Sequence, residues 1–141
     1  MMNADTLKDF KIYFTEVNAF EADFLNEFYD EEITFIDPIH QIKGLSKLID
    51  YFDKLNANVR GGGFTFTDET IVGDIVYLQW KLEIQLKKPR KRIKSSGISV
   101  LVIKDKIVSQ RDYFDAGELF YENIPVLGGL IKWIKRKLSH V

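Results

Sequence analysis

The run Val76-Tyr77-Leu78-Gln79-Trp80-Lys81-Leu82-Glu83-Ile84-Gln85-Leu86 alternates apolar and polar side chains without a break. Because successive side chains of a strand point to opposite faces, this pattern predicts a strand over about 75–87 with one apolar face and one solvated face. Turn residues lie at Gly73-Asp74, at the basic stretch Lys87 to Lys91, and at Lys104-Asp105. They predict a meander of antiparallel strands at about 64–72, 75–87, 92–104 and 106–115.

The residues before the meander are mostly helical in pattern. Apolar side chains recur every three or four residues in two groups, which predicts two amphipathic helices containing Leu7, Phe10, Phe14 and Val17, and Phe20, Phe24, Leu25 and Phe28. A short strand over 33–37 ends at Pro38, which has no N–H to give to a sheet. Gly44 precedes a third amphipathic helix, and Gly61-Gly62-Gly63 is expected to be the loop that ends it.

An antiparallel sheet that covers helices on one side must curve around them. The expected fold class is therefore α+β, a curved antiparallel sheet wrapped around the N-terminal helices in a cone with an apolar interior. Such a cone is a natural ligand cavity. We expect one domain over 1–120 and a basic amphipathic helix within 121–141 that packs on it.

The composition fits a single soluble domain. The 141 residues are 45% hydrophobic and 13% aromatic, which supplies enough apolar surface for a core. Cysteine is absent, so neither disulfides nor thiolate metal sites are expected. Charged residues interrupt the first twenty positions, and no apolar run reaches membrane-spanning length. The expected location is cytoplasmic, with no membrane span.

The net charge of −1 hides an asymmetry, because residues 61–141 carry fourteen basic and nine acidic side chains. Basic residues gather at Lys87–Lys94 and at Lys132–Lys137. A nucleic-acid site would add aromatic side chains for base stacking, and the first cluster contains none. We therefore expect no nucleic-acid partner and interpret this cluster as a solvated hairpin tip.

Asp112 lies in an apolar, strand-forming stretch and is the first candidate for chemistry. Alternation places it on one strand face with Val108, Gln110 and Phe114, which is expected to line the cone. Burial raises the pKa of a carboxyl group toward neutrality, as general acid/base catalysis requires. The alternative is a structural ion pair with Arg111 or a lysine. Asp115, Arg111 and Tyr113 have the opposite parity, and Asp115 is expected on the outside or at an interface.

Asp37 shares a strand face with Ile33 and Phe35 and is the second candidate acid or base. It could instead serve only to turn the chain before Pro38. His40 follows this corner and could move a proton, or it could be an ordinary solvated loop residue. No acidic residue stands at metal-ligand spacing from either histidine, so we expect no metal and no cofactor.

The order of elements, Asp37-Pro38 followed by Gly44, and the last strand Lys106 to Asp115 resemble the nuclear transport factor 2-like superfamily, particularly its SnoaL-like branch. The resemblance covers about residues 5–120. It implies a cone-shaped, cystatin-like barrel. We expect the cavity of the cone to be lined by Phe35, Trp80, Leu82, Ser99, Gln110 and Phe114.

Three enzymes of that superfamily suggest roles for the candidate residues. In ketosteroid isomerase, an Asp before a Pro is the general base and a first-helix Tyr donates to the oxyanion, which implies these roles for Asp37 and Tyr13. Tyr13 could equally be a core tyrosine. The second oxyanion donor, a protonated Asp, would fall near Gly97 to Ser99, where this sequence has no carboxylate.

Limonene epoxide hydrolase has nearly the same Arg-Asp-Tyr-Phe-Asp run, with its first Asp in the catalytic set, at the position of Asp112. The Arg and Asp that complete that set would fall near Trp80 and Leu82, which are apolar here. The polyketide cyclase SnoaL uses one Asp as acid/base without metal or cofactor. This pattern requires only one well-placed carboxylate, and the resemblance again implies Asp112 for that role.

The leading hypothesis is a small apolar ligand in the cone and isomerisation, cyclisation or hydration by a buried Asp. A non-catalytic binding module and a dimeric scaffold are the alternatives. An apolar stripe of Ile98, Val100 and Val102 on the outer sheet face predicts a homodimer formed through the sheet.

Overall fold

The computed structural model describes residues 2–15, 24–115 and 133–139. Its helices are α1 (Ala4–Thr15), α2 (Leu25–Phe28) and α3 (Leu45–Asn56). Its strands are β1 (Tyr29–Ile36), β2 (Gln41–Lys43), β3 (Val59–Val72), β4 (Ile75–Leu86), β5 (Arg92–Ile103) and β6 (Ile107–Phe114). A further short helix covers 133–139.

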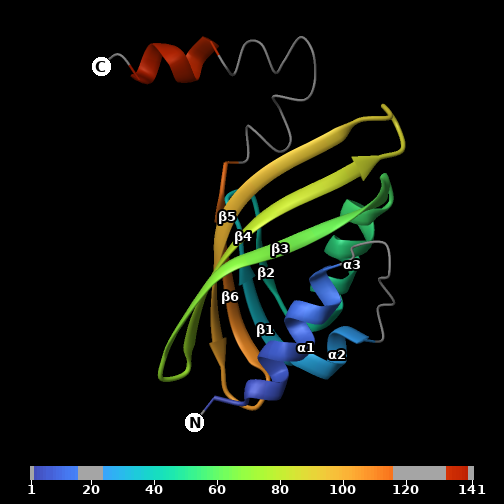
Figure 1. The fold of residues 1–141 in the computed structure, drawn as a ribbon. Helices are drawn as coiled ribbons and strands as arrows, with labels where there is room; N and C mark the ends of the chain where they lie inside the picture. The colour runs from blue at the N-terminus through green and yellow to red at the C-terminus, as the bar shows by residue number, and fades with distance from the viewer. Residues whose placement is uncertain (1, 16–23, 116–132, 140–141) are drawn as a thin grey trace.

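One six-stranded sheet in the order β2-β1-β6-β5-β4-β3 curves around the three labelled helices (Figure 1). The α+β cone and the antiparallel meander of β3 to β6 are therefore confirmed. Two features differ from expectation. The sheet is open rather than a closed barrel, and it is mixed, because β1 pairs with β6 in parallel. The added strand β2 forms because the chain reverses after Pro38 and pairs back on β1.

The triple glycine belongs to β3 and is not the expected loop. Gly61 and Gly63 pair with Gln85 and Glu83 of β4. Gly62 has a φ of 111°, and a Cβ on it would lie 2.1 Å from the carbonyl oxygen of Glu83. Glycine is needed here because the two strands approach too closely for a side chain.

The outcome at the N-terminal helices is mixed. The helix expected from Leu7, Phe10 and Phe14 is α1, whereas the second expected helix is described only as the single turn α2. Val17 and Phe20 lie outside the described residues. The chain is already extended at Tyr29, so β1 begins four residues before the strand that Pro38 defined.

A bulge in β6 corrects the expected face of Val108. Val102 pairs with Ser109 and Ile103 with Ile107, so Val108 is the extra residue without a partner in this ladder. Ile107 rather than Val108 is fully buried in the core. Beyond the bulge, the alternation holds as expected for Gln110, Asp112 and Phe114.

Aromatic rings from the helices and the sheet form the core. Phe14 of α1 lies 6.0 Å from Phe28, 5.9 Å from Phe52 and 5.8 Å from Phe64, measured between ring centroids. All three pairs are edge-on, the arrangement that aromatic rings prefer. This packing fixes α1 against α2, α3 and β3.

Large apolar side chains are also exposed on the surface of the domain. On the convex face, Tyr77, Ile98 and Tyr113 are exposed. In the helix over 133–139, Trp133 is exposed and Lys135 pairs with Asp115. Much of the predicted 121–141 segment lies outside the described residues, so its packing stays a prediction. Among the helices that are described, none has the length and apolarity needed to cross a membrane.

Candidate active site

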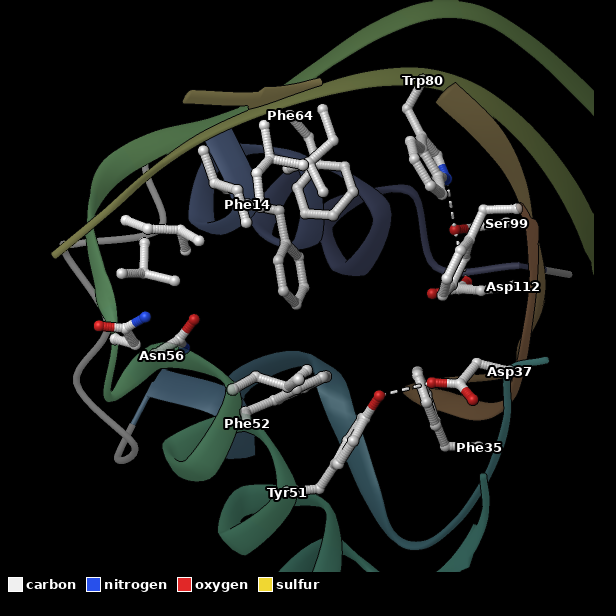
Figure 2. A pocket seen from close by; sticks show the side chains of 18 of the residues that line it. Phe14, Phe35, Asp37, Tyr51, Phe52, Asn56, Phe64, Trp80, Ser99 and Asp112 are labelled. Carbon is white, nitrogen blue, oxygen red and sulfur yellow. Dashed lines mark hydrogen bonds between the residues drawn. The ribbon is translucent and has the colours of Figure 1, made fainter. Parts of the chain in front are cut away.

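A cavity of about 400 Å³ lies between the helices and the concave face of the sheet. This volume is within the usual range for sites that hold small organic molecules. Its middle is walled by rings from α1, α3 and β3, including Phe14, Phe52 and Phe64 (Figure 2). The residues expected to line the cone all border it: Phe35, Trp80, Leu82, Ser99, Gln110 and Phe114.

Asp37 and Asp112 both border one end of this cavity and face each other across it (Figure 2). The parallel pairing of β1 with β6 brings them together. Ile36 is the partner of Arg111, so the next residue of each strand is one of the two acids. Tyr13 and His40 are not among the described residues that line this cavity.

Asp112 receives its hydrogen bonds on one oxygen. Ser99 donates its hydroxyl to Oδ1 of Asp112 at 2.6 Å, and the Nε2 group of Gln110 donates to the same oxygen at 3.0 Å. Among the described residues, none donates to Oδ2. The carboxyl group is therefore held by Oδ1 and leaves Oδ2 for whatever occupies the cavity.

Two buried donors fix the direction of these bonds. Trp80 donates its ring N–H to Oγ of Ser99 at 2.9 Å, so the Ser99 hydroxyl hydrogen is free to point at Asp112. Tyr29 donates its hydroxyl to Oε1 of Gln110 at 2.5 Å, which turns the amide N–H₂ toward Asp112. With Oδ1 occupied as an acceptor, a proton on Asp112 belongs on Oδ2.

The surroundings of Asp112 adjust its acidity to near neutral pH. Burial raises the pKa of Asp112 to about 6, and the negative charge of Asp37 acts in the same direction. The hydrogen bonds from Ser99 and Gln110 lower the pKa and so limit the rise. A carboxyl group with this pKa can both release and accept a proton near neutral pH.

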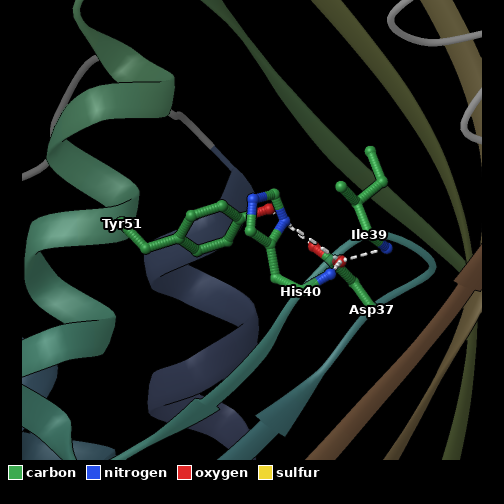
Figure 3. A network of polar contacts seen from close by, with 4 residues as sticks. All are labelled: Asp37, Ile39, His40 and Tyr51. Carbon is green, nitrogen blue, oxygen red and sulfur yellow. Dashed lines mark hydrogen bonds and ion pairs between the residues drawn. The ribbon is translucent and has the colours of Figure 1, made fainter.

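Asp37 differs from Asp112 because both of its carboxylate oxygens accept hydrogen bonds. Its Oδ1 accepts the backbone N–H groups of Ile39 at 2.8 Å and of His40 at 2.6 Å, which closes the turn after Pro38. Its Oδ2 accepts the hydroxyl of Tyr51 at 2.5 Å (Figure 3). Both oxygens thus have partners, and the side chain is only 2% exposed. This arrangement matches the turn-forming alternative for Asp37.

His40 and Tyr13 lie beside the site rather than in it. Nδ1 of His40 is 3.3 Å from Oδ1 of Asp37, and its side chain is 41% exposed. Tyr13 borders a separate hollow formed by α1 and α2. Burial raises the pKa of Tyr13 to about 12, with a smaller contribution from Asp53, so its hydroxyl stays protonated. Their predicted roles in proton transfer and oxyanion binding remain predictions.

Sequence reasoning missed Tyr51 and Tyr29. Tyr51 is on α3 and anchors Asp37, and burial raises its pKa well above the ordinary value. Tyr29 is fully buried and orients Gln110. A tyrosine inside an otherwise apolar helical pattern was the only available signal for Tyr51.

The comparisons with known proteins agree with this architecture. A family model described as the SnoaL-like domain matches residues 10–110. The chain belongs to the SnoaL-like domain family. No curated protein matches the chain closely enough to add a function.

Solved structures share the fold of this SnoaL-like domain at low sequence identity. A protein with a ketosteroid isomerase-like fold from Catenulispora acidiphila, solved with trimethylamine, is 15% identical with a TM-score of 0.71, and the match covers 82% of this chain and 88% of that one. A protein provisionally assigned as a SnoaL-like polyketide cyclase from Shewanella putrefaciens is 12% identical with a TM-score of 0.71, covering 82% and 90%.

A third solved structure covers more of the SnoaL-like domain. This LEH-like epoxide hydrolase from M. tuberculosis is 16% identical with a TM-score of 0.68, and the match covers 94% of each chain. Identities at this level establish the fold only. Within the described part of the chain, no three histidine or acidic side chains are grouped so as to hold a metal ion.

Proposed function

We propose that this SnoaL-like domain binds a small, mainly apolar molecule and that Asp112 moves a proton on it during isomerisation, cyclisation or hydration. One observation carries the proposal: the carboxyl group of Asp112 is held through Oδ1, while Oδ2 lacks a hydrogen-bond partner among the described residues and the group borders an aromatic cavity. With a pKa of about 6, Asp112 has the acidity that the role needs.

Asp112 would act in two steps. As a base, ionised Oδ2 accepts a proton from the ligand, and the electron pair left behind spreads into the ligand's own carbonyl or alkene system. As an acid, Oδ2 then returns the proton to a second atom, so an isomerisation leaves the enzyme unchanged. For a cyclisation, the carbanion formed by the first step attacks a carbonyl carbon of the same ligand, and the oxygen of that carbonyl takes the proton back from Oδ2. For a hydration, protonated Oδ2 gives its proton to one carbon of an alkene, a water molecule adds to the other carbon, and Oδ2 takes a proton from that water.

The hydrogen-bond donors near Asp112 point at carboxylate oxygens, which favours chemistry that needs only one carboxyl group. Ser99, Gln110 and Tyr51 all donate to the two aspartates and not into the cavity. Among the described residues at the end of the cavity with Asp37 and Asp112, these three side chains therefore do not form a pair of donors poised for an oxyanion. Reactions whose negative charge is delocalised in the ligand fit this site better than those that need an oxyanion hole.

The test measures whether the protein catalyses exchange of carbon-bound hydrogen for deuterium. A panel of apolar ketones with acidic C–H groups is incubated in D₂O with the protein, and deuterium incorporation is followed by NMR. We expect catalysed exchange, and a loss of about 100-fold or more in Asp112→Asn, because general base catalysis contributes on this scale.

The matched control is Asp50→Asn, which removes an equal charge from the exposed face of α3. It should leave exchange unchanged. Equal exchange in wild type and Asp112→Asn would rule out the proposal. Ligand binding with no exchange in wild type would instead identify a carrier.

A further inference from the structure

Basic residues border the cavity at the end opposite to the two acids. Among the described residues, the charged side chains that line it are Asp37, Asp112, Lys88 and Lys91. Both lysines lie in the hairpin tip between β4 and β5, within the basic cluster that the sequence predicts to be a solvated turn. Charge is therefore segregated along the cavity, negative at the end with Asp112 and positive at the tip.

The two ends are far apart. Trp80 donates a hydrogen bond to Ser99 at the acidic end of the cavity. From Trp80, strand β4 continues along the cavity wall to Leu86 at the hairpin tip. Six residues of extended strand span about 20 Å. Figure 2 shows the same order along the cavity, with Asn56 at one end, the acids at the other, and Phe14, Phe52 and Phe64 between them.

The hairpin tip is held in place over this end of the cavity. Asn58, which follows α3, accepts the backbone N–H of Lys88 at 3.0 Å and donates to its carbonyl oxygen at 2.7 Å. Its own carbonyl accepts the N–H of Lys87 at 2.9 Å. These bonds fix the backbone of Lys88, which borders this end of the cavity, before any ligand arrives.

The ammonium group of Lys88 is available for a ligand. Among the described residues, it makes no hydrogen bond or ion pair, whereas nearby Arg92 is bound to Glu83 at 2.9 Å. An anionic group on a ligand would be repelled by Asp37 and Asp112 at the other end and attracted here. Electrostatics thus selects both the charge of the ligand and its orientation.

We propose that the ligand of this site is an amphipathic organic acid, whose anionic group binds at Lys88 and Lys91 while its apolar body runs past the aromatic rings toward Asp112. This inference rests on the proposed function for the identity of the site, but not on the proton transfer. The reacting atoms of the ligand then lie at the end remote from its anionic group.

The test compares dodecanoate with its uncharged methyl ester, both below micelle concentration. Binding is followed by the emission of Trp80, which borders the cavity, in a Trp133→Phe background that removes the other tryptophan. We expect dodecanoate to bind about fivefold tighter than the ester, and this preference to disappear in Lys88→Gln/Lys91→Gln, because an exposed ion pair contributes up to about 1 kcal/mol, which corresponds to a factor of about five.

The matched control is Lys81→Gln/Lys94→Gln, which removes the same charge from exposed residues of β4 and β5 that are not among those lining the cavity. It should keep the preference. Equal binding of acid and ester by wild type overturns the inference. So does Lys88-dependent binding to phosphatidylserine vesicles without any preference for dodecanoate, which would make the tip a membrane contact.

Failure of this inference and failure of the proposed function are distinguishable. Asp112→Asn should still bind dodecanoate in preference to the ester, because the tip lies at the other end of the cavity. Charge-independent binding with intact proton exchange removes only the ligand class. Preference for the acid with no exchange in wild type removes only the catalytic role.

Discussion

The raised pKa of Asp112 makes the stability of this fold depend on pH, and Asp112→Asn should reveal the effect. Asparagine keeps an oxygen for the donors Ser99 and Gln110 and puts a neutral group where Oδ2 stands. It thus resembles the protonated aspartic acid at every pH. The difference in unfolding free energy between the variant and wild type should therefore follow the ionisation of a single group.

The magnitude follows from the shift. Burial raises the pKa of Asp112 from 3.8 to about 6. One pKa unit corresponds to about 1.4 kcal/mol, so ionised Asp112 costs the folded state about 3 kcal/mol. Because the unfolded chain loses this proton first, the stability of wild type falls as pH rises through the interval between the two pKa values.

We expect the unfolding free energy of Asp112→Asn to increase relative to that of wild type as pH rises. The advantage of Asp112→Asn should grow by about 2–3 kcal/mol between pH 4 and pH 8, nearly all of it below pH 7. Urea unfolding followed by tryptophan fluorescence at each pH measures it, and a constant effect of the substitution cancels between pH values.

Asp50→Asn is the control, since its difference from wild type should not follow this curve. A flat difference for Asp112→Asn across pH 4–8 would show that the carboxyl group is solvated. The catalytic proposal would lose its basis.

Three further predictions concern the same network and the outer face. Ser99→Ala removes a hydrogen bond that lowers the pKa of Asp112, so carboxyl NMR should show the titration at higher pH; an unchanged midpoint would contradict the bond. Gly97→Ala places a Cβ 2.7 Å from the Trp80 ring and 2.3 Å from the carbonyl oxygen of Tyr113, so denaturation should show a loss of about 1–3 kcal/mol, and wild-type stability would contradict that contact. We propose a homodimer through the convex face, where Ile98 and Tyr113 are exposed; light scattering should show a dimer for wild type and a monomer for Ile98→Asp, and a wild-type monomer at micromolar concentration would refute it.

The meander could be predicted because its information is local. Strict alternation from Val76 to Leu86 and turn residues on both sides define β4 and its neighbours. The glycines of β3 could not be predicted as a strand. Their conformation depends on how closely β4 approaches, and a triple glycine alone resembles a loop.

The site was only partly accessible to sequence reasoning. Alternation correctly gives the face of Asp112, because that residue and Gln110 follow the bulge. Whether each aspartate has an oxygen without a donor depends on partners distant in the chain, such as Tyr51 for Asp37 and Ser99 for Asp112. No local pattern encodes which oxygen a remote hydroxyl will reach.

The parallel pairing of β1 with β6 has a consequence for assembly. These strands come from opposite ends of the domain, so Asp37 and Asp112 become neighbours only after the final strand docks. A nascent chain that has already formed its helices and first hairpins still lacks the acid pair. Pairing between segments so distant in the chain costs more loop-closure entropy than pairing within a hairpin, and the two carboxylates meet only when β6 pairs with β1. The finished charge pair is therefore a signature of a complete native domain.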